Sequence, residues 1–301
     1  MADQPALEVE GLVFRYPDGT EGLRGISFKV ARGEAVALLG ANGSGKSTLL
    51  LTLVGVLRAE GKVKVLGIEL GPGTLRDVRR KTGVLFQDVD AQLFSPRVLD
   101  DVAFGPLNLG RSPEEAESVA RAALAQVGLE GYEKRIPHHL SFGEKKRVAI
   151  ACSLALDPEL LLLDEPTAGL DPKSASELLD VLGDLKARGK TIVATTHDLH
   201  LATELCDRVL VIAKGAVAAE GLPEAILSNR ELLEEHNLIH RHRHRHRHAH
   251  VSEHAGRNLP VIGGAVVDGT HEHEHEHGHA HDHGHMHDED GHGHGEEHLH
   301  S

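Results

Sequence analysis

The chain has 301 residues, of which 40% are hydrophobic, so it can bury a sizeable core in one large or two small domains. It contains no run of about 18 apolar residues that would span a bilayer, and its first residues lack the basic and apolar segments of a signal peptide. The net charge of -14 argues against a general nucleic-acid binder, so we expect a cytosolic protein with no nucleic-acid partner. Cys152 and Cys206 lie in apolar, helix-like segments and are expected to be buried, reduced thiols.

Short apolar runs and amphipathic segments alternate along the chain and indicate an α/β protein with a β-rich beginning. The predicted strands are Ala6–Phe14, Ile26–Val30, Ala35–Leu39, Lys62–Val65, Val84–Phe86, Leu160–Leu163, Thr191–Thr195 and Val209–Ala213. The predicted helices are Thr48–Leu57, Ser112–Val127 and Pro172–Arg188. Ser112 precedes an acidic first turn, as an N-cap does, and the region from Pro106 to Leu140 is expected to form a helical subdomain.

The segment GANGSGKST, residues 40–48, matches a phosphate-binding loop. Glycines let successive backbone N–H groups turn toward a phosphate, the lysine adds a positive charge, and the serine hydroxyl completes a Mg²⁺ shell. A predicted strand runs into this phosphate loop and a predicted helix leaves it, so the helix dipole points at the anion. The loop residues expected to bind the nucleotide are Gly40, Asn42, Gly43, Gly45, Lys46, Ser47 and Thr48.

A second motif, LLLLDE at residues 160–165, ends a buried strand in two carboxylates. Asp164 would lie at the carboxyl end of the strand, beside the phosphate loop, where it can hold a Mg²⁺-bound water. Glu165 is then the expected general base for the attacking water.

Three further segments complete a pattern: LSFGEKKRVAIA at 140–151, AGLD at 168–171 and TTHD at 195–198. With them the sequence resembles the ATP-binding-cassette ATPases over about residues 7–229. The resemblance implies a phosphate-loop core with a mostly parallel sheet, an antiparallel β subdomain and a helical subdomain that carries the signature, residues 140–144. It also implies that two subunits, identical or paralogous, sandwich two ATP molecules head to tail.

Carried onto this chain, the resemblance gives roles to residues of the signature and its neighbours. Ser141, Gly143 and Glu144 would contact the γ-phosphate of ATP held by the other subunit, and Asp171 would link the two sites. The signature departs from the commonest form, LSGGQ, because Phe142 replaces a glycine and Glu144 a glutamine. The phenylalanine raises a steric question, and the glutamate adds negative charge near a polyanion.

The resemblance also places three residues around the nucleotide itself. Tyr16 would stack on adenine, and Gln87 would sense Mg²⁺ and touch a membrane partner. His197, 32 residues after Glu165, would orient the γ-phosphate and the water. The expected catalytic residues are therefore Glu165, His197 and Gln87, and the expected Mg²⁺ ligands are Ser47, Gln87 and Asp164.

The stretch from Val84 to Gly110, with Gln92 and the segment Asp101–Pro106, closely resembles the energy-coupling-factor ATPases. Members of that group drive micronutrient importers with a transmembrane coupling protein and a separate substrate-capturing membrane protein. The resemblance thus implies a peripheral protein on the cytoplasmic face of the cell membrane.

Composition changes near His236, since 21 of the 25 histidines lie in residues 236–301. We therefore divide the chain into an ATPase domain, 1–235, and a low-complexity tail, 236–301, expected to be disordered without metal. Imidazole suits nickel and cobalt, and alternating His-x-His spacing brings rings to one side of an extended chain. The tail residues expected to bind Ni²⁺ or Co²⁺ are His242, His244, His246, His248, His271, His273, His275 and His277.

The sequence thus favours the ATP-hydrolysing subunit of a cobalt or nickel importer. A metal-insertion GTPase with a phosphate loop is disfavoured by the signature, by Tyr16 and by the lack of an Asn-Lys-x-Asp motif. A metal-buffering protein, in which the tail is the main function, stays open. So does a tail with no metal role.

Overall fold

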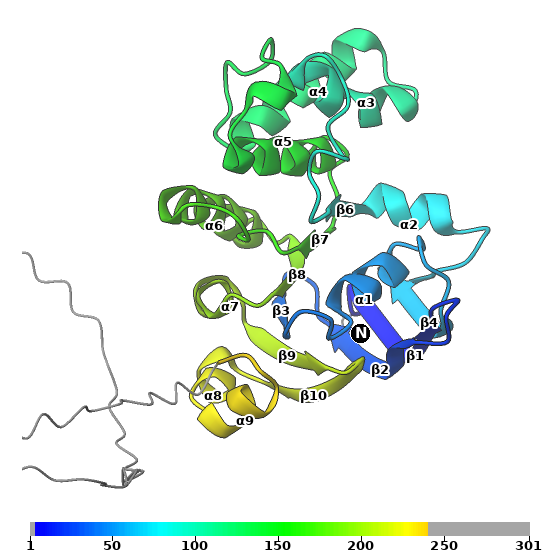
Figure 1. The fold of residues 1–301 in the computed structure, drawn as a ribbon. Helices are drawn as coiled ribbons and strands as arrows, with labels where there is room; N and C mark the ends of the chain where they lie inside the picture. The colour runs from blue at the N-terminus through cyan, green and yellow to red at the C-terminus, as the bar shows by residue number, and fades with distance from the viewer. Residues whose placement is uncertain (1–3, 240–301) are drawn as a thin grey trace, which may run out of the picture. The chain divides into compact units, whose positions relative to one another are not determined.

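The computed structural model describes residues 4–239, and Figure 1 shows two sheets with a group of helices beyond one of them. The first sheet is antiparallel, with strand order β2-β1-β4-β5. Its strands are β1 (Leu7–Arg15), β2 (Glu21–Val30), β4 (Glu60–Val65) and β5 (Ile68–Glu69). This sheet is the antiparallel β subdomain that the sequence predicts.

The second sheet has the order β10-β9-β3-β8-β7-β6 and is parallel except for β10. Its strands are β3 (Ala35–Leu39), β6 (Thr82–Leu85), β7 (Leu160–Asp164), β8 (Thr191–Thr196), β9 (Arg208–Ala213) and β10 (Ala216–Gly221). The central strands β3, β7 and β8 are buried along their whole length, as strands covered on both faces must be. The mostly parallel core of the predicted α/β fold is confirmed.

Alternate side chains of β3 enter two different cores. Ala35, Ala37 and Leu39 pack with the apolar faces of helices α3 to α7, whereas Val36 and Leu38 pack with α1 and the antiparallel sheet. The helices are α1 (Lys46–Leu53), α2 (Leu75–Lys81), α3 (Val98–Asn108), α4 (Pro113–Gln126), α5 (Phe142–Leu154), α6 (Pro172–Ala187), α7 (Leu199–Leu205), α8 (Pro223–Leu227) and α9 (Arg230–Glu235). A short 3₁₀ helix, Pro137–His139, precedes α5.

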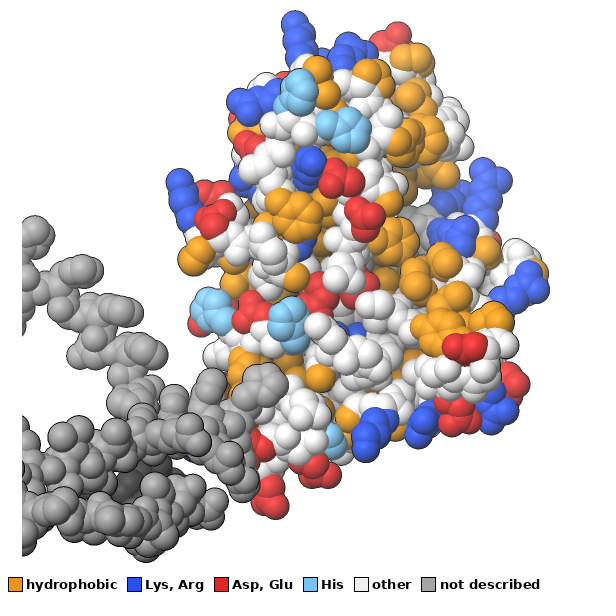
Figure 2. Space-filling model, in the orientation of Figure 1, with side chains coloured by type: hydrophobic (Ala, Val, Ile, Leu, Met, Phe, Trp, Pro, Cys, Tyr) orange, Lys and Arg blue, Asp and Glu red, His pale blue; other side chains and the backbone are white. Residues whose placement is uncertain are grey.

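The helical subdomain consists of α3, α4 and α5, which lie together at the top of Figure 1. Ser112 caps α4 as predicted, because its hydroxyl accepts from Glu115 N and the Glu115 carboxylate accepts from Ser112 N. On the face in Figure 2, apolar side chains gather over α3. Phe94, 61% exposed, meets Phe104 edge to face with ring centroids 5.0 Å apart.

Several boundaries differ from the predicted ones. The first helix begins at Lys46 and ends at Leu53 rather than spanning Thr48–Leu57, since Gly55 adopts a positive φ of 67° just beyond it. Strand β2 begins earlier, at Glu21, and continues through Gly25, which has φ 75° where its pairing with β1 is irregular. Within residues 4–239 no helix has both the length and the apolar character needed to cross a bilayer.

Candidate functional site

The phosphate loop joins β3 to α1, and glycine is required at both of its ends. Gly45, the N-cap of α1, has φ 106°, and a Cβ there would lie 2.7 Å from the carbonyl oxygen of Gly22. A Cβ on Gly40 would lie 2.5 Å from the carbonyl oxygen of Ile212. The loop therefore passes too close to its neighbours for a side chain at either position.

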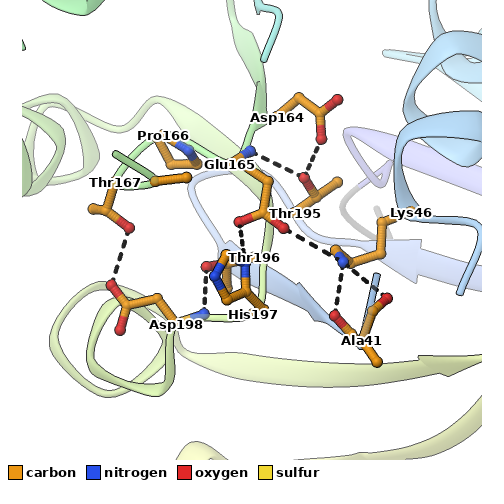
Figure 3. Close-up of polar contacts among 12 residues, drawn as sticks. Ala41, Lys46, Asp164, Glu165, Pro166, Thr167, Thr195, Thr196, His197 and Asp198 are labelled. Atoms are coloured by element: carbon orange, nitrogen blue, oxygen red, sulfur yellow. Dashed lines mark hydrogen bonds and ion pairs between the residues drawn. The ribbon is translucent and has the colours of Figure 1, made fainter. Parts of the chain in front are cut away.

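Asp164 ends β7 beside the phosphate loop, as the sequence predicts. The hydroxyl of Ser47 donates to Asp164 Oδ1 at 3.2 Å, and the hydroxyl of Thr195 donates to the same oxygen. Three oxygen-bearing side chains from α1, β7 and β8 thus converge at the carboxyl edge of the sheet. Figure 3 shows the contact between Asp164 and Thr195.

Glu165, the next residue, has left-handed backbone, with φ 49°, and is 6% exposed. Its N–H donates to both the carbonyl oxygen and the hydroxyl of Thr195, each at 3.1 Å. Its carboxylate lies between two nitrogens: Lys46 Nζ is 3.4 Å from Oε1, and His197 Nδ1 is 2.9 Å from Oε2 (Figure 3). Lys46 also donates to the carbonyl oxygen of Gly40 at 2.7 Å, so its ammonium bridges the phosphate loop and the carboxylate.

Tyr16 lies beside the first turn of α1. Its hydroxyl is 2.6 Å from Thr48 Oγ1, and its ring meets that of Phe14 edge to face. Tyr16 as a whole is 39% exposed, so part of this residue is accessible beside α1.

The signature forms the N-terminus of α5, with Ser141 as N-cap. The carboxylate of Glu144 accepts from Ser141 N at 2.8 Å and from the Tyr132 hydroxyl at 2.7 Å, and the Arg135 guanidinium lies 3.8 Å away. Burial opposes ionisation of Glu144, but these hydrogen bonds and Arg135 outweigh it and lower its pKa. The negative charge of Glu144, which the sequence placed near a polyanion, is thus paired with groups of its own chain.

Phe142 packs against the loop that follows Glu165, and Gly143 lies against the first turn of α6. The Phe142 ring packs against Gly169, where a Cβ would lie 3.2 Å from the ring, and a Cβ on Gly143 would lie 3.0 Å from Ser174 Cβ. The Phe142 side chain therefore has space beside Gly169. A side chain at position 143, in contrast, would crowd Ser174 of α6. Asp171 caps α6, accepting from Ser174 N at 3.0 Å and from the Ser174 hydroxyl at 2.6 Å. These hydrogen bonds lower the pKa of Asp171.

Gln87 is exposed just after β6, and no hydrogen bond within residues 4–239 joins it to Asp164, Glu165 or Lys46. The loop that carries it is fixed by Gln92, which accepts from Phe86 N at 2.9 Å and donates to the carbonyl oxygen of Val84 at 3.1 Å. Asp90 of the same loop is 2.7 Å from Lys145 of α5.

The site contains three residues to which the sequence assigns no individual role, although they lie inside the segments TTHD and LSFGEKKRVAIA. Thr195 connects Asp164 to Glu165, and Asp198 accepts from the Thr167 hydroxyl at 3.0 Å while it caps α7. Lys146 donates to the carbonyl oxygen of Glu165. A threonine in a strand, an aspartate in a turn and a lysine in a helix are ordinary residues, and only their positions inside these segments could have drawn attention to them.

The expected tail ligands, His242 to His277, lie outside the described residues, as does most of the tail, 236–301. Among residues 4–239, no group of three or more histidine, cysteine, aspartate or glutamate side chains is arranged to hold a metal ion.

Comparison with known proteins decides the family. Residues 23–168 match the ABC transporter family. The energy-coupling factor transporter ATP-binding protein EcfA of Methanocaldococcus jannaschii is 50% identical over 235 residues, which are 77% of this chain and 84% of that protein. This chain belongs to the ABC transporter ATPases.

Other ABC transporter ATPases extend the similarity. A putative ABC transporter ATP-binding protein of Streptomyces coelicolor is 49% identical over 238 residues, 78% of this chain and 90% of that protein. The structure of cbiO1 from Clostridium perfringens, described as part of the ABC transporter complex cbiONQ, has a TM-score of 0.69 at 39% identity, covering 78% of this chain and 95% of that one. The chain is therefore an ATP-hydrolysing, energy-coupling subunit of a transporter in this family.

Proposed function

We propose that this ABC transporter ATPase powers the import of nickel or cobalt ions, with Glu165 as the general base of ATP hydrolysis. The observation that carries the ATPase part is the buried carboxylate of Glu165 held between Lys46 and His197, at the edge of the sheet that bears the phosphate loop. The metal part is supported by the chemistry of the tail and by the likeness to cbiO1.

The ion pair between Lys46 and Glu165 describes the site before ATP binds. When a γ-phosphate enters, it competes for the Lys46 ammonium, which as a flexible point charge can turn from the carboxylate to the phosphate. With Lys46 turned to the phosphate, Oε1 of Glu165 becomes available to accept a hydrogen bond from the attacking water. Glu165 would then take the proton of the attacking water while His197 Nδ1 keeps the carboxylate oriented.

The residues around Asp164 fit a magnesium ion. Mg²⁺ prefers oxygen ligands and usually keeps several waters, and Ser47 Oγ lies 3.2 Å from Asp164 Oδ1. Ser44 Oγ of the phosphate loop is buried and has no hydrogen-bond partner among the described residues, as expected of a loop built around a polar ligand. Ser47 and Asp164 would hold the ion, with Gln87 joining them if its loop moves. When bound, the ion neutralises charge on the phosphates.

The signature is proposed to act on the nucleotide of a second subunit. In Figure 1, α5 belongs to the helical subdomain, whereas α1 and the phosphate loop lie on the other side of β6 and β7. Head-to-tail pairing of two copies, or of this chain with a paralogue, would bring Ser141 and Gly143 to the other subunit's ATP. The exposed Phe94 and Phe104 near α3 support contact with an apolar partner, which we propose is the transmembrane coupling protein.

The proposal is tested by uptake. The full chain would be purified from membranes of its source in mild detergent, with its bound subunits, and the complex placed in liposomes containing ATP. We expect ATP-dependent uptake of radioactive nickel or cobalt, and we expect Glu165→Gln to abolish it. Glu231→Gln, at an exposed glutamate of α9, is the matched control and should transport normally.

Each outcome has a separate meaning. Uptake of an organic micronutrient without metal uptake would overturn the metal assignment and leave the energy-coupling role intact. Absence of any bound membrane subunit, together with full metal binding by the tail, would favour the metal-buffering protein.

A further inference from the structure

Lys146, in the second turn of α5, is the largest of the fully buried side chains in the described part of the chain, with 1% of its surface exposed. A buried ammonium costs free energy unless it is fully hydrogen-bonded, so a lysine rarely occupies such a position without a specific partner. Burial lowers the pKa of Lys146 to about 8, against the opposing effect of the carboxylates of Glu165 and Asp164.

All three N–H donors of Lys146 are used by one loop. They go to the carbonyl oxygens of Glu165 at 2.8 Å, Pro166 at 2.7 Å and Ala168 at 2.8 Å. The Nζ atom also lies 5.0 Å from the centre of the Phe142 ring, one turn earlier on α5. The lysine thus fastens the first turns of α5 to the loop that follows β7.

The residue at the start of that loop has unfavourable backbone geometry. Glu165 has φ 49°, and a non-glycine residue persists in this region only where its surroundings fix it. Here the Glu165 N–H is held by Thr195 and the Glu165 carbonyl oxygen by Lys146, one contact on each side of the Cα atom. This backbone conformation aims the carboxylate between Lys46 and His197.

We propose that Lys146 is a positioning residue that holds Glu165 in its catalytic orientation and links the signature helix to the carboxylate of its own chain. The inference rests on the proposed role of Glu165 as general base. It adds a physical connection between the two ATP sites. Ser141 and Gly143, at the N-terminal end of α5, would contact the nucleotide of the partner subunit. Lys146, on the next turn of the same helix, donates hydrogen bonds to the loop that begins at Glu165 of its own chain.

The direct test removes the donors and keeps the shape. Lys146→Met retains the length of the apolar stem without any N–H group, and Lys146→Gln retains two donors. We expect Lys146→Met to lower kcat for ATP by about 10²-fold, because small misplacement of a catalytic group costs about that much, with KM and ATP affinity nearly unchanged. Lys146→Gln should recover part of the rate. Lys134→Met, at an exposed lysine before the signature, is the matched control.

Two results would overturn the inference. One is a Lys146→Met enzyme whose kcat equals that of the control. The other is a loss of kcat that follows the loss of folded protein, measured by circular dichroism, with Lys146→Gln no better than Lys146→Met. Glu165→Gln in the same assay separates the two proposals: if that variant stays active, the general-base role fails, and a slow Lys146→Met enzyme must have another cause.

A mixed-dimer experiment tells which site Lys146 serves. In the first dimer, a chain with Lys46→Ala pairs with a chain carrying Lys146→Met, so the intact phosphate loop and the altered lysine share a chain. In the second, one chain carries both changes and pairs with an unchanged chain. We expect the first dimer to turn over ATP more slowly than the second. Equal rates, or the reverse order, would show that Lys146 does not act on the carboxylate of its own chain.

Discussion

Glu165 combines several features that rarely meet in one residue. It is buried, it has left-handed backbone, and its carboxylate has a lysine on one side and a histidine on the other. A surface glutamate would have none of these constraints, so the surroundings are suited to a group whose position and charge must be controlled.

Replacing Glu165 by glutamine should separate binding from turnover. Glu165→Gln keeps the shape and the contact to His197, so ATP should still bind, while turnover should fall by about 10²–10⁴-fold, the usual contribution of a positioned base. ATP should then trap a dimer, which light scattering would detect. An ATPase rate close to that of the Glu231→Gln control would show that Glu165 is not the general base.

The two cysteines should be chemically inert in the folded chain. Desolvation raises the pKa of Cys206 to about 12 and also raises the pKa of Cys152, so neither thiol forms the reactive thiolate at pH 8. We expect iodoacetamide at pH 8 to label neither residue in the native protein and both in urea, counted by mass spectrometry. Cys206 is buried and Cys152 is half-buried in the fold. Rapid native labelling of either cysteine would contradict the expected lack of reactivity.

At the scale of elements, two helices of the helical subdomain begin with the same device. Ser112 of α4 and Ser141 of α5 each cap a helix, and Glu115 and Glu144 each complete a capping box. Only the capping box of α5 lies in the signature. A change in the capping box of α4 therefore measures what such a box contributes to stability, separately from the signature.

Removing the cap of α4 should cost stability without affecting catalysis. Ser112→Ala should lower the free energy of unfolding by about 1 kcal/mol, because the N–H of Glu115 loses its acceptor. Urea titration followed by circular dichroism measures this effect. Ser118→Ala, at an exposed position within the same helix, should be neutral or slightly stabilising, since alanine favours helix interiors. Equal stabilities for the two variants would contradict the capping role of Ser112.

Elements defined by local pattern were predictable from the sequence. The strands β3 and β7, the phosphate loop and the cap of α4 follow from apolar runs, glycine spacing and an N-cap residue, all of which act over a few positions. Helix α3 was missed because Gly105 and Pro106, near its C-terminal end, resemble helix breakers. In the fold, Gly105 lies against Leu156, where a Cβ would be 3.0 Å from a side-chain carbon, so tertiary packing explains the glycine.

Contacts made through space were not predictable in the same way. The sequence brings Asp164 and Glu165 to the end of a strand, but it contains no sign that Thr195 will bridge them. Nor does the sequence around Lys146, which lies between two other basic residues, indicate that this lysine is buried against three carbonyl groups. Such contacts depend on which strands become neighbours, and β7 and β8 are separated in sequence by α6.

For the whole molecule, the proposed sharing of sites can be tested by complementation. A chain with Lys46→Ala lacks its phosphate-loop charge, and a chain with Ser141→Arg has a blocked signature, so each alone should be inactive. A mixed dimer should contain one site with both parts intact and should recover ATPase activity. If mixed dimers form, as shown by native mass spectrometry, but hydrolyse no more ATP than either parent, the head-to-tail arrangement is wrong.

The last prediction concerns the histidine-rich tail, which we propose is a metal reservoir or sensor rather than part of the motor. Neutral imidazole binds metal and protonated imidazole does not, so Ni²⁺ or Co²⁺ affinity should fall as the pH drops through about 6.5. The glutamates between His271 and His277 favour protonation and should move this loss to higher pH. The arginines from Arg241 to Arg247 disfavour protonation and should keep binding at lower pH.

Truncation after Glu235 provides the test of this tail assignment. Isothermal titration of the full and truncated chains at two pH values should show multi-site metal binding only in the full chain, while ATP hydrolysis stays nearly the same. Replacing the histidines at 271–277 by glutamine should remove the component of binding lost first on acidification, because the remaining arginine-flanked histidines bind to lower pH. Equal metal stoichiometry in the full and truncated chains would refute the assignment, and collapse of ATPase activity on truncation would show that the tail belongs to the folded motor.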